Sequence, residues 1–453
     1  MKKEKKLGEP KKLGFSAFLP LIVFLALYVG CGVTFTIMGK ESPFSYFPRH
    51  TALLFGLAVA VILLPGIKID EKVNVFTKSM GESGVMLIVL LYLMAGGFQG
   101  AAAAMGGKDS VVNLALTLIP AKLLIPGVFL MCCLISTAIG TSMGTIAAMA
   151  PVAIGVAQGA GLNPAICAAA VIGGSYFGDN LSMISDTTIA AAQGCGSEMK
   201  DKFRMNFFMV LPAAIIAMVL YAVFGGGATG EVVAGEFNLW LVLPYIVVLV
   251  TALLGVNVVV VLFIGIAMTG VIGLLAGTTT FFDWVQGLGG GMSDMFSISI
   301  VAALISGLIG LIRLYGGVEW LVNAITGKIK SRKSAEYGIS LLSGILSAAL
   351  VNNTIAIITT APMAKEIGAK YGIAPKRLAS LIDIFACAFI ALMPHDGGIL
   401  ICTALADCSP LDILPYSFYM FALIICVCLT IQFGWLRTPE EKEFAKKQQE
   451  EAV

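Results

Sequence analysis

Charge is scarce in this chain of 453 residues. Lysine, arginine, aspartate and glutamate together make up 12% of it, about half the share found in soluble domains, and the mean hydropathy is +0.94. Residues 123–178 and 238–282 contain no charged side chain and no histidine. Because about 20 apolar residues cross a bilayer, each stretch is long enough for more than one crossing. This lack of charge excludes a soluble protein.

Histidine is rarer still, with two residues, and the ten cysteines show no spacing typical of a disulfide framework or a metal site. We interpret the cysteines as small packing residues. The net charge of +2 indicates no nucleic-acid partner. The apolar runs are too long for barrel strands, and an open sheet cannot satisfy its backbone in lipid. The sequence therefore predicts an all-α polytopic protein of the lipid bilayer with roughly 12–14 transmembrane segments.

Fourteen helical segments follow from the apolar runs and their Gly, Pro and polar breaks. They cover 15–38, 51–66, 84–104, 123–139, 142–160, 164–197, 205–224, 238–254, 256–275, 296–315, 334–350, 352–364, 378–406 and 412–436.

An internal repeat links two stretches that lie 211 residues apart. Residues 136–164 read STAIGTSMGTIAAMAPVAIGVAQGAGLNP, and residues 347–375 read SAALVNNTIAIITTAPMAKEIGAKYGIAP. Two such halves in an apolar chain are typical of a membrane transporter whose site lies between the repeats. The aligned pairs are Pro151 with Pro362, Gly161 with Gly372, Pro164 with Pro375 and, at an offset of 210, Gly106–Gly107 with Gly316–Gly317.

The repeat divides the chain into two halves. The N-terminal half covers 15–224 after a basic tail at 1–14, and it contains repeat 1 at about 84–224. The C-terminal half covers 225–453; it contains repeat 2 at about 296–436 and a tail at 437–453.

Basic residues predict the orientation of the chain, because they accumulate on the cytoplasmic side. The loop after Pro362 is basic, whereas the equivalent loop after Pro151 has no charge, so we expect the repeats to be inverted in the membrane. Both termini are then cytoplasmic in a multi-pass protein of the cell (plasma) membrane, and the acidic segments 225–237 and 276–295 are outside. The cytoplasmic markers are Lys2, Lys3, Lys5 and Lys6; a loop with Lys200, Lys202 and Arg204; a loop with Lys328, Lys330, Arg332 and Lys333; and Arg437, Lys442, Lys446 and Lys447.

The most polar stretch inside an apolar region is 173–188, GGSYFGDNLSMISDTT. A carboxylate in the bilayer usually faces a cavity and marks an ion or proton path. Asp179 and Asp186 share one face if the helix is continuous, and a break between them is an equal alternative. A polar loop outside the membrane is the competing interpretation. The expected Na⁺ ligands are Asp179, Asn180, Ser182, Asp186, Thr187 and Thr188, with Asp179 and Asp186 as the carboxylates.

The second half supplies a further polar cluster. Asn352, Asn353 and Thr354 align with Thr141, Ser142 and Met143, and such groups at a helix break can hold a cation or an anionic group. Packing between helices is the alternative role.

Three ionisable residues belong to the same cluster. Asp383 is a lone carboxylate inside a predicted span, unless it forms an ion pair with Lys376 or Arg377. His395 and Asp396 follow Pro394, and Asp396 aligns with Ser185. His395 is a candidate partner for a proton or a substrate carboxylate. A purely structural hydrogen bond is the alternative for His395.

The stretch YFGDNLSMISDTT resembles the signature of NhaC-type sodium/proton antiporters, and residues 140–179 and 409–419 are also similar to that family's pattern. The resemblance implies the ion transporter superfamily fold, with inverted repeats, helical hairpins and interrupted helices. It implies ion-site roles for Asp179, Ser182, Asp186 and Thr187, and Asp383 matches the family's Leu-Glu-Asp motif. A homodimer is compatible with the superfamily.

Other parts of the second half match less well. The segment Val351–Thr354 is similar to the Ser-Asn-Thr break of sodium-coupled carboxylate carriers. Where NhaC-type chains usually have Pro-Trp-Asn after a Gly/Thr/Ser-rich run, this chain has Pro394-His395-Asp396 after apolar residues. This departure leaves the transported species open.

The leading hypothesis is a secondary active Na⁺/H⁺ antiporter that works by alternating access, with Na⁺ and H⁺ as the transported or coupling ions and no cofactor. Na⁺- or H⁺-coupled transport of a small organic solute, an amino acid or a hydroxycarboxylate, is the alternative. A channel is a third class. An enzyme is not expected, because the G-x-S-x-G pattern at 140–144 requires a preceding strand that a membrane helix cannot supply.

Overall fold

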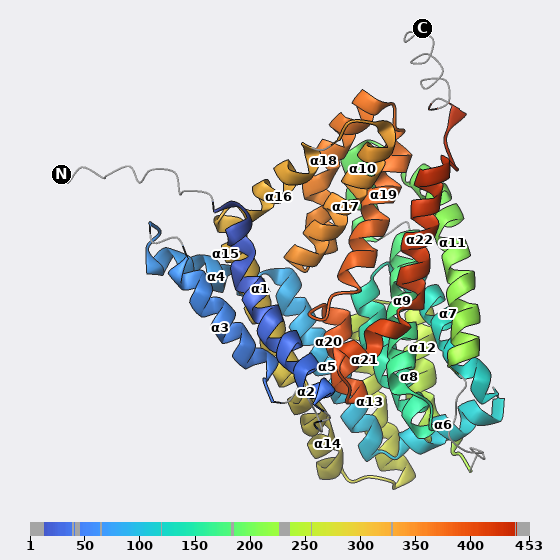
Figure 1. Ribbon diagram of the computed structural model, residues 1–453. Helices are drawn as coiled ribbons and strands as arrows, with labels where there is room; N and C mark the ends of the chain where they lie inside the picture. Colours follow the sequence, from blue (N-terminus) through green and yellow to red (C-terminus); the bar gives the residue numbers. More distant parts are fainter. Residues whose placement is uncertain are drawn as a thin grey trace. The chain divides into compact units, whose positions relative to one another are not determined.

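The computed structural model describes residues 13–38, 40, 46–63, 66–118, 120–182, 185–225, 236–254, 256–327, 329–439 and 441. Most of both predicted tails, Glu231 of the acidic segment and Lys328 lie outside the described residues. Every regular element in the described part of the chain is helical, as Figure 1 shows, so the predicted all-α architecture is confirmed.

The chain forms two compact units. The first comprises Met1–Val89 and Ser299–Lys328, and the second comprises Leu90–Ile298 and Ile329–Val453. Helices α5 (Ser83–Ala104) and α15 (Phe296–Leu314) contribute residues to both.

The first unit is tied together by hydrogen bonds from side chains to main-chain carbonyls. Tyr315 donates its hydroxyl to the Ala60 carbonyl at 2.6 Å, and Ser306 donates to the Ser79 carbonyl at 2.9 Å. None of the predicted site residues lies in this unit. Its elements are η1 (Gly14–Phe18), α1 (Leu19–Leu25), η2 (Ala26–Gly30), α2 (Cys31–Ile37), α3 (Arg49–Ile62), α4 (Ile69–Met80) and α16 (Gly317–Thr326), with parts of α5 and α15.

The second unit contains all of the predicted site residues. Its elements, besides parts of α5 and α15, are α6 (Gly107–Leu118), α7 (Ala121–Ile139), α8 (Ser142–Gly159), α9 (Pro164–Leu181), α10 (Asp186–Cys195), α11 (Met199–Phe224), α12 (Leu239–Leu253), α13 (Val258–Ala276), α14 (Phe281–Asp294), α17 (Arg332–Leu350), α18 (Asn353–Tyr371), α19 (Pro375–Ile390), α20 (Gly397–Ala406), α21 (Pro410–Ile413), η4 (Leu414–Tyr416) and α22 (Phe418–Phe433).

The sequence repeat is also visible in the backbone. Helix α17 begins and ends 211 residues after α7, and α20 begins and ends 211 residues after α10. Three loop positions with positive φ match at that offset, although only one pair is glycine in both halves. The same chain path is therefore built twice from different residues. The matched positions are Gly140 (φ 78°) with Val351 (φ 48°), Gly161 (66°) with Gly372 (62°), and Gly196 (76°) with Asp407 (49°).

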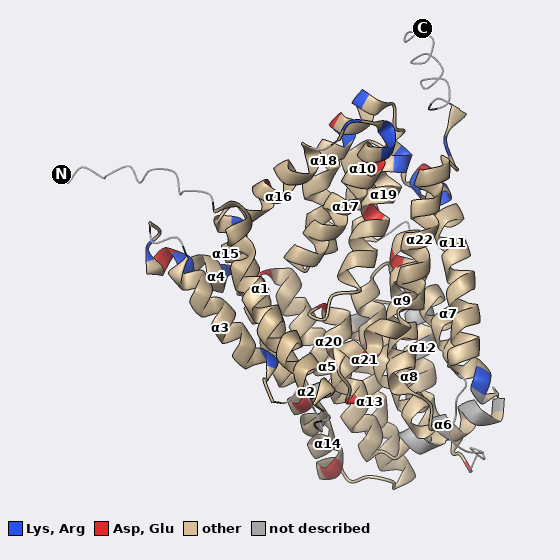
Figure 2. Cartoon of the chain, in the orientation of Figure 1, with Lys and Arg blue, Asp and Glu red and all other residues tan. Residues whose placement is uncertain are grey.

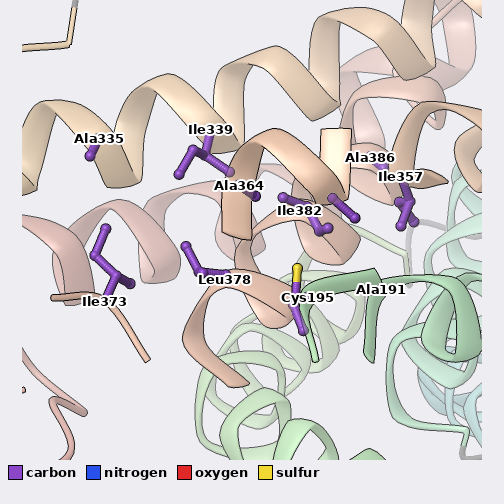
Figure 3. Close-up of a cluster of buried hydrophobic side chains, with 12 residues drawn as sticks. Ala191, Cys195, Ala335, Ile339, Ile357, Ala364, Ile373, Leu378, Ile382 and Ala386 are labelled. Carbon is purple, nitrogen blue, oxygen red and sulfur yellow. The ribbon is translucent and has the colours of Figure 1, made fainter. Parts of the chain in front are cut away.

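The two halves exchange their short helices. Helix α10 packs against α18 and α19 of the second half, and α20 packs against α8 and α9 of the first half, as can be followed in Figure 1. Figure 3 shows the buried cluster that α10 forms with α18 and α19, to which α17 also contributes, and which is made mostly of alanine and isoleucine. Because Gly194 lies against Ala361, a Cβ atom there would come within 2.5 Å of the alanine Cβ. Small residues thus bring α10 close to α18.

Among the described residues, six helical stretches are long and apolar enough to cross a membrane, or seven if the bent pair α20 and α21–η4 is one span. The sequence predicted 12–14 transmembrane segments. The difference arises partly because the structure divides predicted spans into shorter helices: 164–197 becomes α9 and α10, and 378–406 becomes α19 and α20. Four helices, α4, α6, α14 and α16, lie outside the predicted ranges, because the pattern search followed unbroken apolar runs. Three of the four carry charged or polar residues along an amphipathic face, and α14 is rich in glycine.

Within the second unit, basic side chains gather where α18 ends and α19 begins, as Figure 2 shows. Lys365, Lys370 and Lys376 lie in this region, and Lys376 approaches Asp201 of α11 at 3.7 Å.

Candidate functional site

Asp179 is the most enclosed carboxylate of the predicted ion site. It lies in the last turn of α9 and is 2% exposed. Ser142 donates its hydroxyl to Oδ2 at 2.8 Å, and Ser185 donates to Oδ1. Ser185 also lies 2.9 Å from the hydroxyl of Thr187. Asp179 therefore lies in the protein interior.

A helix break puts these hydroxyls around the carboxylate. Helix α9 ends at Leu181 and α10 begins at Asp186, while residues 183 and 184 lie outside the described residues. Ser142 begins α8 after the left-handed Gly140, and Thr141 caps that helix by accepting a hydrogen bond from the Gly144 amide. Two interrupted helices thus meet at Asp179.

Asp186 occupies a different environment. It opens α10, is exposed, and accepts a 2.6 Å hydrogen bond from Thr354 in the first turn of α18. This pair lines a cavity of about 510 Å³ between α10 and α18. The remaining lining residues are Ile189, Ala190, Gln193, Gly194, Ile358 and Pro362.

Asp383 of α19 forms a fully buried ion pair. Lys202 of α11 approaches Asp383 Oδ2 at 2.6 Å, and both side chains are 0% exposed. Asn206 donates to the same oxygen at 3.1 Å. The expectation that Lys202 marks a cytoplasmic loop is wrong, because α11 begins at Met199 and carries Lys202 into the protein interior. The alternative partner residues, Lys376 and Arg377, pair instead with Asp201 and Glu336.

The second-half asparagines lie at the opening turn of α18. Asn352 caps the helix by accepting from the Ile355 amide at 2.9 Å. Asn353 donates to the Cys387 sulfur at 3.6 Å, and Cys387 is buried one turn after Asp383 on α19. Cys387 thus belongs to the surroundings of the site.

His395 and Asp396 occupy the break between α19 and α20. Asp396 caps α20, because its Oδ2 accepts from the Gly398 and Ile399 amides at 2.9 and 3.3 Å. Its other oxygen lies 3.3 Å from the hydroxyl of Tyr176, which precedes Asp179 on α9. His395 Nε2 lies 3.2 Å from the Ala348 carbonyl oxygen. The hydrogen bonds to Oδ2 make Asp396 a helix cap, and Tyr176 links it to the Asp179 region.

The G-x-S-x-G pattern at 140–144 follows helix α7 and forms the start of α8. The strand-to-helix turn of a hydrolase nucleophile is therefore not present at this pattern. Ser142 instead donates its hydroxyl to Asp179.

Most of the predicted residues converge. Asp179, Ser142, Thr187, Thr188 and Asp383 form one buried network, and Asp186 with Thr354 lies at its exposed side. Sequence reasoning missed four participants. Lys202 and Asn206 could have been recognised, because a charged and a polar residue lie four positions apart on one helix face just before an apolar run. Nothing in the sequence distinguishes Tyr176 and Cys387 from packing residues.

Oxygen atoms dominate the network, from carboxylates, hydroxyls and main-chain carbonyls released at helix ends. Such atoms suit hard cations. Within the described residues, no three His, Cys, Asp or Glu side chains gather as a metal site would require. A monovalent cation held by mixed oxygen ligands, or a proton on a carboxylate, matches this chemistry.

An interrupted-helix bundle with buried acids at its breaks defines a polytopic membrane transporter. The chain belongs to the Na⁺/H⁺ antiporter family, whose model matches residues 13–226 and 231–437. The predicted family resemblance is thereby confirmed.

Individual relatives are distant. The chain is 24% identical to the Na⁺/H⁺ antiporter NhaC of Alkalihalophilus pseudofirmus, over 69% of this chain and 74% of that protein. It is also 24% identical to the malate-2H⁺/Na⁺-lactate antiporter of Bacillus subtilis, over 53% of each chain. Among solved structures, the YdaH transporter of Alcanivorax borkumensis has 13% identity and a TM-score of 0.39, over 93% of this chain and 99% of that one.

Proposed function

We propose that this protein exchanges Na⁺ for H⁺ across a membrane, with Asp179 and Asp186 as the carboxylates that hold either ion. The observation that carries the proposal is the burial of Asp179 between two serine hydroxyls at a helix break. A buried carboxylate is costly unless a proton or a cation neutralises it.

Mutually exclusive occupancy gives the exchange. With Na⁺ bound, the hydroxyls of Ser142 and Ser185 turn their lone pairs toward the cation; with a proton bound, they pair with the neutral acid. Asp186 interacts electrostatically with Asp179 and lies on the exposed side of the network, where it can receive the ion first.

Two cavities support alternating access. The Asp186 cavity lies between α10 and α18. A second cavity of about 330 Å³ is lined by α5, α8, α14 and α20, with one residue each from α6 and α12. The two cavities share three equivalent positions of the repeat: Gln193, Gly194 and Pro362 of the first correspond to Ala404, Leu405 and Pro151 of the second. We infer that the halves are inverted in the membrane and that each cavity is the entrance from one side.

The basic end of the second unit, with Lys365, Lys370 and Lys376, is the cytoplasmic side in this proposal. The Asp186 cavity then opens toward the cytoplasm. The basic residues of both tails place the two termini on the cytoplasmic side of the cell (plasma) membrane by the same rule.

The test is Na⁺-driven proton movement in proteoliposomes, recorded with a pH-sensitive dye and with ²²Na⁺ uptake. Asp179→Asn should lower both rates at least about 100-fold, because a neutral amide cannot alternate between Na⁺ and a proton. Asp201→Asn is the matched control; this carboxylate is 42% exposed and lies outside the network, so the rates should stay within about twofold. Full exchange by the Asp179→Asn variant would remove Asp179 from the site.

A second candidate is coupled transport of a small hydroxycarboxylate or amino acid. The observation that favours it is the size of the Asp186 cavity, about 510 Å³, which is far more than a bare ion needs. The similarity to a malate/lactate antiporter points to the same class. A thermal-shift panel of organic solutes, with and without Na⁺, separates the candidates. Stabilisation by a solute that requires Na⁺ favours the second, and stabilisation by Na⁺ alone favours the first.

A further inference from the structure

Lys202 is an unusual side chain in this network, because its ammonium is completely buried among oxygen atoms. Nζ lies 2.6 Å from Asp383 Oδ2, 2.5 Å from Thr188 Oγ1 and 3.2 Å from the Asn180 carbonyl oxygen. These three oxygens come from α19, α10 and α9, while Lys202 enters from α11.

The three oxygens are of the kinds that a dehydrated monovalent cation takes: a carboxylate, a hydroxyl and a main-chain carbonyl. The Asn180 carbonyl lies in the last turn of α9, which ends at Leu181, and the last carbonyls of a helix have no partner within it. Asn206 donates to two of the three, at 2.8 Å from the Asn180 carbonyl and 3.1 Å from Asp383, and so holds them in place.

We propose that these atoms form a second monovalent-cation site and that Lys202 fills it as a cation tethered to the protein. The ammonium neutralises Asp383 and leaves Asp179 and Asp186 as the acids that exchange ions. Lys202 therefore limits how many cations the network binds. The inference deepens the proposed function, because it concerns the ion number of the same network.

A buried ion pair that serves only folding is the competing account. That account predicts lower stability when Lys202 is removed, whichever salt is present. The tethered-cation account predicts that Na⁺ replaces the missing ammonium, so the loss of stability should depend on the cation in the buffer.

The experiment uses Lys202→Met in the purified full-length protein. Melting temperature is measured in NaCl and in choline chloride at equal ionic strength, and bound ²²Na⁺ per chain is counted at equilibrium. Lys202→Met should bind one Na⁺ more per chain than the wild type. Its melting temperature should be low in choline and recover in NaCl. The double variant Lys202→Met/Asp383→Asn should lose the additional Na⁺.

Arg377→Met is the matched control. Arg377 is also 0% exposed and pairs with Glu336 at 3.2 Å, away from the helix breaks. Its removal should lower the melting temperature equally in both salts.

A second arm keeps the lysine and removes its carboxylate. In Asp383→Asn the ammonium stays near Asp179 without its counter-ion, so the Na⁺ affinity of the network should fall about tenfold or more and return in the double variant.

Two results would overturn the inference. The first is a Lys202→Met protein that binds no additional Na⁺, or that fails to fold in both salts. The second is an unchanged Na⁺ affinity in Asp383→Asn. The proposed function fails separately, if the wild-type protein shows no Na⁺-specific binding. The difference in bound Na⁺ between Lys202→Met and the wild type still tests the second site in that case.

Discussion

At the scale of single residues, the two acids of the signature stretch lie in contrasting surroundings. Asp179 is buried between hydroxyls, and Asp186 is exposed and held by Thr354 of the other half. The contrast exists because the chain breaks between them. In the proposed mechanism, an ion that enters the Asp186 cavity meets an exposed carboxylate first and a buried one second.

Thr354 should tune the affinity of the entrance for Na⁺. Thr354→Val keeps the shape of the side chain and removes its hydrogen bond to Asp186. A hydrogen bond to a charged group contributes about 1.5 kcal/mol, so the Na⁺ concentration for half-maximal exchange should rise about tenfold. Thr359→Val is the control, because the Thr359 hydroxyl bonds only the Ile355 carbonyl of its own helix at 2.8 Å. Equal Na⁺ dependence in the two variants contradicts a role for Thr354 at the entrance.

At the scale of elements, the site is a product of helix ends. Helices α8, α10, α18 and α20 all begin at breaks in the chain, and a side chain caps the first turn of α8, α18 and α20. Helices α8 and α18 also follow a residue with positive φ. Gly140 at φ 78° permits the first of these turns, because a side chain with Cβ is strained in that region. Val351 adopts φ 48° at the equivalent place, which is costly for a β-branched residue.

Gly140→Ala should therefore destabilise the protein by about 1–2 kcal/mol, because alanine is strained in the left-handed region. The melting temperature in detergent measures the effect. Gly155→Ala is the matched control. Gly155 lies inside helix α8, where an added Cβ meets no atom within 4 Å, so that this variant should be as stable as the wild type or slightly more stable. A Gly140→Ala protein that melts like the Gly155→Ala protein contradicts the strained turn.

At the scale of the whole molecule, the repeat governs how the second unit is assembled. Each half gives its short helix to the other, so that α10 packs on α18 while α20 packs on α8. The proposed inverted arrangement predicts that equivalent loops of the two repeats lie on opposite sides of the membrane.

Labelling of two single cysteines tests that arrangement. Gly159→Cys and Lys370→Cys are equivalent in the repeat, and both positions are exposed. They are introduced after the four partly exposed cysteines, Cys31, Cys408, Cys426 and Cys428, have been replaced by serine. In intact cells, a membrane-impermeant maleimide should label position 159, whereas position 370 should react only after permeabilisation. Labelling of both from the same side rules out inverted repeats.

Sequence patterns predicted much of this picture. The lack of charge indicates the membrane, the matched Pro and Gly positions reveal the duplication, and the polar stretch around Asp179 marks the ion site. These features are local or periodic, so that they can be recognised without knowing the fold. The divided helices were harder to predict, because α9 and α10 are both apolar and the polar residues between them are compatible with either a continuous helix or a break.

By itself, the sequence determined the class of this protein, its duplicated architecture and the acids at its centre, because composition and spacing express them directly. Only the tertiary structure decided that Lys202 points inward to Asp383 and that Asp186 meets Thr354. Those contacts join residues more than 160 positions apart, and they depend on how α10, α11, α18 and α19 pack. Helix packing arises from many side chains acting together, and no single stretch of sequence encodes it.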